Sequence, residues 1–150
     1  MENKALQELI LITEHDGEGF KRVVESGQWS VAIKNYQPLN DINNIDALMR
    51  HLLTDEVFIL FEGGCILLTD CSADQSGTDI DCLPLEKGKV YCVNKGVWHA
   101  TIVSKDVKLI IVEDRNASQE NSETYHLSQE QIAAITKVIR KGRCDLDNKK

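Results

Sequence analysis

Two histidines and a glutamate are the residues of this sequence whose types best suit metal chemistry. Four residues separate His51 from Glu56, and His99 lies well beyond them in the chain. Neutral imidazole and carboxylate groups are common ligands of Zn, Mn, Fe and Ni. Each histidine adjoins a stretch with strand-like patterning, and a small barrel is a fold that brings distant strands together. The residues therefore predict a divalent-metal site made by His51, Glu56 and His99.

The segments that must position these residues have the pattern of short β-strands. Trp29, Val31 and Ile33 alternate with small or polar residues, and later segments are short apolar runs separated by turn signals. The pair Gly63-Gly64 is typical of a two-residue hairpin turn. Many short strands at this spacing indicate a sandwich or barrel. The predicted strands are WSVAIKNY at 29–36, EVFILFE at 56–62, CILLTD at 65–70, DIDCLPLE at 79–86, VYCV at 90–93, WHATIVS at 98–104 and VKLIIVE at 107–113.

Helical patterns occur only at the two ends of the chain. Apolar residues at helical spacing predict a short amphipathic helix over 4–13. Ser128 and Gln131 form a capping box that predicts a helix over about 128–141, with Gly142 as its C-cap. No linker divides the chain. We expect one domain over 1–150, with a barrel core at about 29–113 and a C-terminal arm and helix at about 114–142.

Composition and charge restrict the function classes. The net charge of −7 argues against nucleic-acid binding and against adsorption to an anionic membrane. No apolar run approaches the roughly 20 residues of a membrane span, and the N-terminus lacks the features of a signal peptide. We expect a cytoplasmic protein with reduced cysteines, because the five cysteines include no CxxC pair. A Cys71–Cys82 bridge is the alternative, and spacing gives it no support.

The spacing of these residues resembles the motifs of the cupin family. The first cupin motif is G-x5-H-x-H-x3,4-E-x6-G, and His51, Glu56 and Gly63 match its second histidine, its glutamate and its last glycine. The second motif is G-x5-P-x-G-x2-H-x3-N, and Gly88, Gly96 and His99 match it. The resemblance covers about residues 44–103. It implies a mainly β fold, the double-stranded β-helix or jelly-roll barrel, with short N-terminal and C-terminal helices.

The sequence departs from these motifs at informative positions. Met49 stands where the first histidine is expected, Asn94 replaces the proline and Val103 replaces the closing asparagine. The family's full set of ligands is three histidines and one glutamate, so this chain keeps two histidines and the glutamate. A thioether is a poor ligand for such ions. The chain also resembles small bacterial cupins, some of which carry a ureidoglycolate-lyase-like label.

Two kinds of function agree with this pattern. One is a metal-dependent lyase, isomerase or oxygenase acting on a small polar metabolite, such as a sugar derivative or a hydroxy or keto acid, with Glu56, if it is not a metal ligand, or Tyr91 moving protons. The other is a non-catalytic binding protein with a degenerate or empty metal site. No organic cofactor is evident. We expect a small-molecule ligand as partner, and a homodimer because the edge strands of a barrel favour association.

Asp55, Trp98, His15 and His126 receive other interpretations. Asp55 is interpreted as a turn or hydrogen-bonding residue rather than a ligand. Trp98 alternates with His99, so we expect it to point away from the barrel interior. His15 and His126 lie in polar segments and are expected to be solvated.

Overall fold

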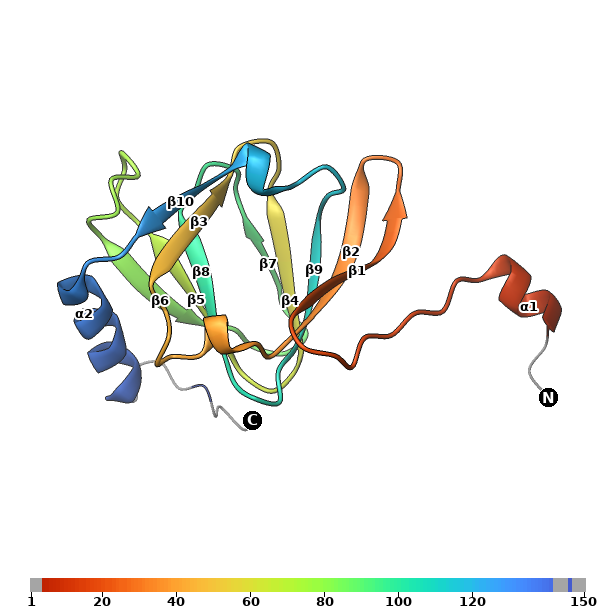
Figure 1. Cartoon of the computed structure of the whole chain (residues 1–150), viewed down its shortest axis with the longest axis horizontal. Coiled ribbons are helices and arrows are strands. Elements are labelled where there is room, and N and C mark those ends of the chain that lie inside the picture. The colour runs from red at the N-terminus through yellow and green to blue at the C-terminus, as the bar shows by residue number, and fades with distance from the viewer. Residues whose placement is uncertain (1–3, 142–145, 147–150) are drawn as a thin grey trace.

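The structure is a computed structural model, and it describes residues 4–141 and 146. Two five-stranded antiparallel sheets face each other, as Figure 1 shows. The first sheet has the strand order β1-β2-β9-β4-β7 and the second has the order β10-β3-β8-β5-β6. The predicted mainly β barrel is therefore confirmed. The strands are β1 (Phe20–Ser26), β2 (Trp29–Asn35), β3 (Ala47–His51), β4 (Glu56–Glu62), β5 (Cys65–Asp70), β6 (Ile80–Pro84), β7 (Val90–Val93), β8 (His99–Val103), β9 (Lys108–Asp114) and β10 (Ser122–His126).

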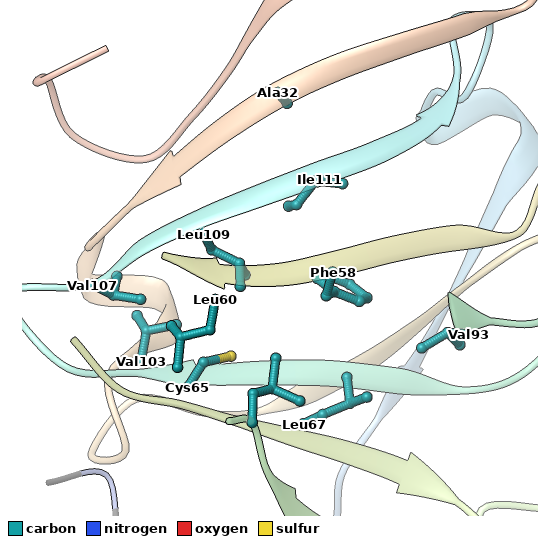
Figure 2. Packing of buried hydrophobic residues seen from close by; sticks show 11 residues of the cluster. Ala32, Phe58, Leu60, Cys65, Leu67, Val93, Val103, Val107, Leu109 and Ile111 are labelled. Carbon is teal, nitrogen blue, oxygen red and sulfur yellow. The ribbon is translucent and has the colours of Figure 1, made fainter. Parts of the chain in front are cut away.

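The inner faces of the two sheets make one apolar core, because successive side chains in a strand point to opposite faces. Phe58, Leu109 and Ile111 come from the first sheet and meet Leu67 and other side chains of the second sheet (Figure 2). The outer face of the second sheet carries a separate cluster. Helix α2 (Gln129–Arg140) packs against that cluster through buried isoleucines. The first sheet has no such helix on its outer face in the described part of the chain.

The capping box of the C-terminal helix is present as predicted. The Ser128 side chain accepts a hydrogen bond from the backbone N–H of Gln131, and the Gln131 side chain accepts one from the backbone N–H of Ser128. Gly142 lies outside the described residues. The N-terminal helix is shorter than predicted, since α1 covers Lys4–Leu9 and none of its residues is buried. Figure 1 shows it well away from the barrel, so no packing extends the helix to residue 13.

The predicted hairpin at Gly63-Gly64 is wrong. Strand β4 pairs with β7 and β9, whereas β5 pairs with β6 and β8, so the glycines carry the chain from one sheet to the other. Gly63 has a φ of +71°, and a Cβ added there would come within 2.7 Å of the Val107 backbone. A tight glycine turn thus serves a crossover between sheets as well as a hairpin, and local sequence does not distinguish the two.

Three strands lie in segments where no strand was predicted. Strand β1 precedes the predicted barrel core, β3 follows a polar connection, and β10 lies in the polar segment after residue 114. The β10 burial pattern shows no fully buried residue, so the strand lacks the apolar alternation that identifies strands from sequence. Its register is fixed by pairing, with Ser122 opposite His51 and Thr124 opposite Met49.

Candidate metal centre

The three predicted ligands meet inside the barrel from both sheets. His51 ends β3 and His99 begins β8 in the second sheet, whereas Glu56 begins β4 in the first. The three side chains are 11%, 7% and 10% exposed, in that order. One ligand atom of each lies within 4.8 Å of those of the other two. The fold therefore assembles the group of metal-ligating types that the motif spacing indicated.

Loop contacts hold the strand ends that carry these residues. The backbone N–H of Gly96 donates to the carbonyl of His51 at 2.7 Å, which joins the end of β3 to the turn before His99. Asp55 accepts a hydrogen bond from the backbone N–H of Lys95 at 2.8 Å. This contact agrees with the interpretation of Asp55 as a hydrogen-bonding turn residue.

The outer nitrogen of each imidazole acts as a hydrogen-bond donor. His99 Nδ1 lies 2.9 Å from the carbonyl oxygen of Val97, which can only accept. His51 Nδ1 lies 2.8 Å from Ser122 Oγ. Ser122 donates its single hydroxyl proton to the carbonyl of Ser118, at 2.6 Å, so its oxygen accepts from His51. Both rings therefore carry a proton on Nδ1, as metal-binding histidines generally do when the other nitrogen is the ligand.

This tautomer leaves both Nε2 atoms facing the same carboxylate oxygen. Glu56 Oε2 lies 3.0 Å from His51 Nε2 and 2.8 Å from His99 Nε2. Two lone pairs and a carboxylate repel one another at such distances unless positive charge lies among them. Either protons on the imidazoles or one divalent cation can supply that charge. The donor set and its convergence thus fit a metal ion.

The electrostatics of the site favour an ionised Glu56. Burial alone raises the pKa of Glu56, but the hydrogen bonds from His51 and His99 and the charges of the two rings outweigh burial and lower it to about 2. The hydrogen bond to Glu56 in turn raises the pKa of His51, against the opposing effect of burial. In the absence of a metal, the site therefore favours a charged carboxylate beside a protonated imidazole.

A second carboxylate, which sequence reasoning missed, borders the site. Glu113 is opposite Glu56 in the pairing of β9 with β4, so both side chains point into the barrel. Its Oε1 accepts a hydrogen bond from Arg22 Nη2 at 3.3 Å, and its Oε2 lies 3.6 Å from His51 Nε2. Burial and the charge of Glu56 raise the pKa of Glu113. The alternation of β9 was the signal for its inward direction, but the sequence did not pair β9 with β4.

Lys34 is a second polar residue of the interior that sequence reasoning did not single out. Its Nζ donates to Thr101 Oγ1 at 3.1 Å, and Thr101 is the next inward-facing residue after His99 on β8. Burial lowers the pKa of Lys34, and the charges of Cys65 and Glu56 oppose this effect. A lysine therefore accompanies the ligand group on the barrel interior.

Met49 lies on the same strand face as His51 but outside the ligand group. It is opposite His99 in the pairing of β3 with β8 and is 40% exposed. A side chain that shares the inward face and is nonetheless exposed indicates that this side of the barrel is open to solvent. Met49 is therefore an exposed neighbour of His99 on this face.

Tyr91 lies on β7 beside Phe58, one inward position away from Val93, the residue opposite Glu56. Its hydroxyl accepts a hydrogen bond from the backbone N–H of Glu86 at 3.0 Å. It packs partly buried against the inner core. This contact lies in the turn before β7, whereas Glu56 is opposite the last residue of β7, so the structure does not bring the Tyr91 hydroxyl together with the three candidate ligands.

The remaining predicted positions have structural surroundings. Trp98 points away from the barrel interior and is buried in the outer cluster, where the guanidinium of Arg50 lies 4.4 Å from its ring centroid. His15 is not fully solvated, since its Nε2 lies 3.0 Å from the carbonyl oxygen of Gly19, whereas His126 is exposed. No disulfide joins the described cysteines, so the alternative Cys71–Cys82 bridge is absent from the described residues. Cys144 lies outside the described residues.

No family model and no curated protein matches the sequence. Among solved structures, the chain is similar to a Streptomyces Pac13 variant with uridine, at 5% identity and a TM-score of 0.52 over 74% of this chain and 79% of that one. Another structure of Pac13, described as a nucleoside dehydratase, gives 5% identity and a TM-score of 0.51 over 74% and 80% of the two chains.

A cupin-2 domain-containing protein from Shewanella frigidimarina NCIMB 400 is also similar. The match has 20% identity and a TM-score of 0.48 and covers 76% of this chain and 95% of that one. The architecture is a cupin-like sandwich of two five-stranded sheets. None of these structures is described as a ureidoglycolate lyase, so that label is unsupported. Neither helix of the described chain has the length and apolar character needed to cross a bilayer.

Proposed function

We propose that this chain is a cupin-type protein that holds a divalent metal ion through His51, Glu56 and His99 and binds or transforms a small polar metabolite. One observation carries the proposal. Both imidazoles commit Nδ1 as a donor, which directs both Nε2 atoms at one oxygen of a buried carboxylate. Such a group binds a divalent ion, and Zn, Mn, Fe and Ni all accept this donor set.

The chemistry of such a site follows from the groups around it. A bound divalent ion acts as a Lewis acid toward a carbonyl or vicinal oxygens of a substrate. Glu56, when it is not bound to the metal, is our proposed proton-transfer group, and Tyr91, whose hydroxyl lies against the backbone of Glu86, is the alternative. Lys34 is a hydrogen-bond donor on the same interior, where its Nζ contacts Thr101. This set suits a sugar derivative or a hydroxy or keto acid, and lyase, isomerase and oxygenase reactions all remain open.

The comparison with Pac13 supports the size and polarity of the proposed ligand. A fold of the same kind is described there with uridine, a small polar molecule. The exposed Met49 on the inward face of β3 gives such a molecule an approach to the three ligands. Thermal unfolding of the metal-loaded protein in the presence of small hydroxy acids, keto acids and sugar derivatives tests this proposal, and a raised unfolding temperature counts as a hit. A hit that requires metal supports the proposal, and a hit unaffected by His99→Ala contradicts it.

Metal analysis tests the ligand assignment. Protein purified without an affinity tag or chelator should contain near-stoichiometric metal by mass spectrometry. The double variant His51→Ala/His99→Ala should lose it, whereas His126→Ala, which removes an exposed histidine, should retain it. Metal content that is unchanged in the double variant would contradict the assignment.

A non-catalytic binding protein is the second candidate. The replacement of the first motif histidine by Met49 favours it, because fewer protein ligands weaken the site. In this case protons supply the positive charge between the imidazoles and Glu56, and the raised pKa of His51 agrees with this. Stability that is unchanged by Mn, Fe, Ni and Zn would favour this candidate over the metal-dependent one.

We also propose that the chain forms a homodimer through the outer face of the first sheet. The outward face of its central strands carries partly buried apolar residues, among them Val57, Ile59, Ile110 and Val112, with the polar residues Lys108 and Asp114 at the two ends of β9. A protein seldom leaves so continuous an apolar surface open to water. The second sheet hides its outer face under α2, and the first sheet has no comparable cover within residues 4–141.

The N-terminal segment supports a second copy as the partner. Leu9, Leu11 and Ile12 are 84%, 71% and 78% exposed, and the segment projects from the barrel in Figure 1. It is attached at His15, whose carbonyl accepts hydrogen bonds from Asn35 and Lys108, both at 2.8 Å. An apolar arm and an apolar sheet face on the same chain are complementary when two copies meet.

Light scattering and sedimentation test this dimer. We expect a dimer at micromolar concentration, a monomer for Ile59→Lys, and weaker association for the arm variant Leu11→Ser/Ile12→Ser. The control Lys137→Glu on α2 should remain dimeric. A wild-type monomer would contradict the proposal, as would a dimer indifferent to both the sheet and the arm substitutions.

A further inference from the structure

The buried side-chain polar atoms that lack a hydrogen-bond partner in the described residues are Arg22 Nε and Glu113 Oε2. Both belong to the ion pair beside the proposed metal centre. The Glu113 side chain is 6% exposed. An unpartnered carboxylate oxygen at this depth is costly unless a positive group faces it. The structure therefore leaves one acceptor of Glu113 without an assigned role.

The direction of Glu113 Oε2 is fixed by the contacts of the other carboxylate oxygen, Oε1. Arg22 donates to Glu113 Oε1 at 3.3 Å and is itself held by the carbonyl oxygens of Ala117 at 2.6 Å and Arg115 at 3.0 Å. The other oxygen, Oε2, lies 3.6 Å from His51 Nε2. A simple Arg22–Glu113 ion pair accounts for the first oxygen and leaves the second one directed at the metal-ligating nitrogen of His51.

The neighbouring strands bring Glu113 to the same group from the first sheet. Glu113 and Glu56 are opposite each other in the pairing of β9 with β4, so their carboxylates lie side by side on the inner face. Met49, which stands at the position of the first motif histidine, is 40% exposed and offers only a thioether. The carboxylate of Glu113 is thus a harder, more deeply buried donor than the residue at that motif position.

We propose that Glu113 Oε2 is the fourth protein ligand of the cation held by His51, Glu56 and His99. The inference rests on the proposed metal centre. The resulting donor set has two imidazoles and two carboxylates, and Arg22 compensates part of the added negative charge. Oxygen donors suit hard ions, so this donor set favours Mn²⁺ more than a set with three imidazoles would. Arg22 acts as a positioning residue, because it holds Oε1 and thereby aims Oε2.

Titration of the metal-stripped full chain tests the proposal. Mn²⁺ is followed by electron paramagnetic resonance, and Co²⁺ by its visible absorption, which reports the ligand geometry. We expect Glu113→Gln to weaken Mn²⁺ binding at least about 10-fold and to change the Co²⁺ spectrum. Glu25→Gln removes an equal charge from an exposed ion pair with Arg115 and should change neither.

A second variant separates a ligand from a structural ion pair. Glu113→Asp keeps the negative charge beside Arg22 and withdraws the oxygens from His51, and its thermal unfolding shows whether the fold is intact. The proposal expects Mn²⁺ binding weakened as in Glu113→Gln and an altered Co²⁺ spectrum. Restoration of wild-type affinity and spectrum by Glu113→Asp would show a structural role and overturn the proposal.

The outcomes also distinguish this proposal from the metal centre itself. Wild-type protein that binds metal, with an unchanged affinity and spectrum in Glu113→Gln, overturns the role of Glu113 and leaves the three-residue site standing. Wild-type protein that binds neither Mn²⁺ nor Co²⁺ overturns both. Binding that weakens in Glu113→Gln and not in Glu25→Gln supports both.

Discussion

Two buried carboxylates, Asp70 and Glu56, occupy strand ends in opposite sheets and have opposite surroundings. Asp70 is 2% exposed and its oxygens accept hydrogen bonds from Ser72 Oγ at 2.7 Å and from the backbone N–H of Gly77 at 2.7 Å. Further backbone N–H groups of Ser72 and Asp79 lie at 3.1 and 3.4 Å. These donors satisfy Asp70 completely and tie the 71–79 loop to β5.

Glu56 is buried to a similar degree but faces groups that also need positive charge. Its neighbours are two imidazole Nε2 atoms and the carboxylate of Glu113 across the strand pair. A carboxylate satisfied by backbone N–H groups organises structure, because its donors are fixed by the fold. A carboxylate surrounded by other acceptors is stable only with protons or a cation, so it is suited to binding. The comparison predicts that substitutions at the two positions change different properties.

The largest effect is expected at Asp70. The substitution Asp70→Ala leaves the buried N–H of Gly77 without its acceptor and frees the 71–79 loop, and should lower the free energy of unfolding by about 3 kcal/mol. Urea unfolding monitored by circular dichroism measures this. Metal affinity of the folded variant should stay within error of wild type. A loss of metal affinity at full stability would reverse the assignment of the two carboxylates.

Glu56→Gln is expected to have the complementary effect. It removes the ligand charge between the two imidazoles, so metal affinity should fall at least about 100-fold, more than the loss of an outer partner causes. Stability of the metal-free protein should fall by less than in Asp70→Ala, because the amide oxygen of the glutamine can still accept a hydrogen bond from an imidazole. Isothermal titration calorimetry gives the affinity. Unchanged affinity would exclude Glu56 as a ligand.

Two serines sharpen the same comparison at smaller magnitude. Ser122 Oγ accepts a hydrogen bond from His51 Nδ1, whereas Ser72 Oγ donates one to Asp70. Ser122→Ala should weaken metal binding about 10-fold, since the partner that fixes the His51 ring is lost. Ser72→Ala should instead reduce stability by about 1 kcal/mol and leave metal affinity unchanged. If both variants change the same property, the distinction between the two carboxylates fails.

The smallest expected change is in the acid dependence of stability. Burial raises the pKa of Asp70, but the hydrogen bonds from Ser72, Gly77 and Asp79 outweigh it and hold the pKa below the ordinary value of 3.8. The contribution of Asp70 to the free energy of unfolding is therefore complete at pH values above its pKa in the unfolded chain. It is lost as the pH falls through its pKa in the folded protein. Asp70→Asn should flatten the decline of unfolding free energy below about pH 4. An unchanged slope would show that Asp70 does not contribute in this way.

Much of the candidate metal centre could be predicted from the sequence because it depends on short, fixed spacings. His51, Glu56 and His99 lie at motif offsets on or beside strands whose patterns are clear. The crossover at Gly63-Gly64 could not be predicted, because a local turn signal does not say which strands will pair. Strand β10 was missed because its burial is weak and its register comes from pairing with β3.

Glu113 and Ser122 became site residues only through long-range pairing. Glu113 comes from an apolar strand that could pair with several others, and only the β4–β9 ladder places it beside Glu56. Ser122 comes from a polar segment without strand patterning, yet it fixes the tautomer of His51. Local sequence patterns identify the candidate ligands. The residues that orient these ligands or place a charge beside them are determined by the register between distant strands.

The most direct test of the metal centre is the protonation of its two imidazoles, read by long-range nitrogen–proton NMR with and without Zn²⁺. We predict that His51 and His99 both retain the Nδ1 proton on Zn²⁺ addition, while both Nε2 resonances shift to values typical of a coordinated nitrogen. Nε2–H tautomers that persist at saturating Zn²⁺ would contradict the account, since the lone pairs assigned to the metal would then be absent.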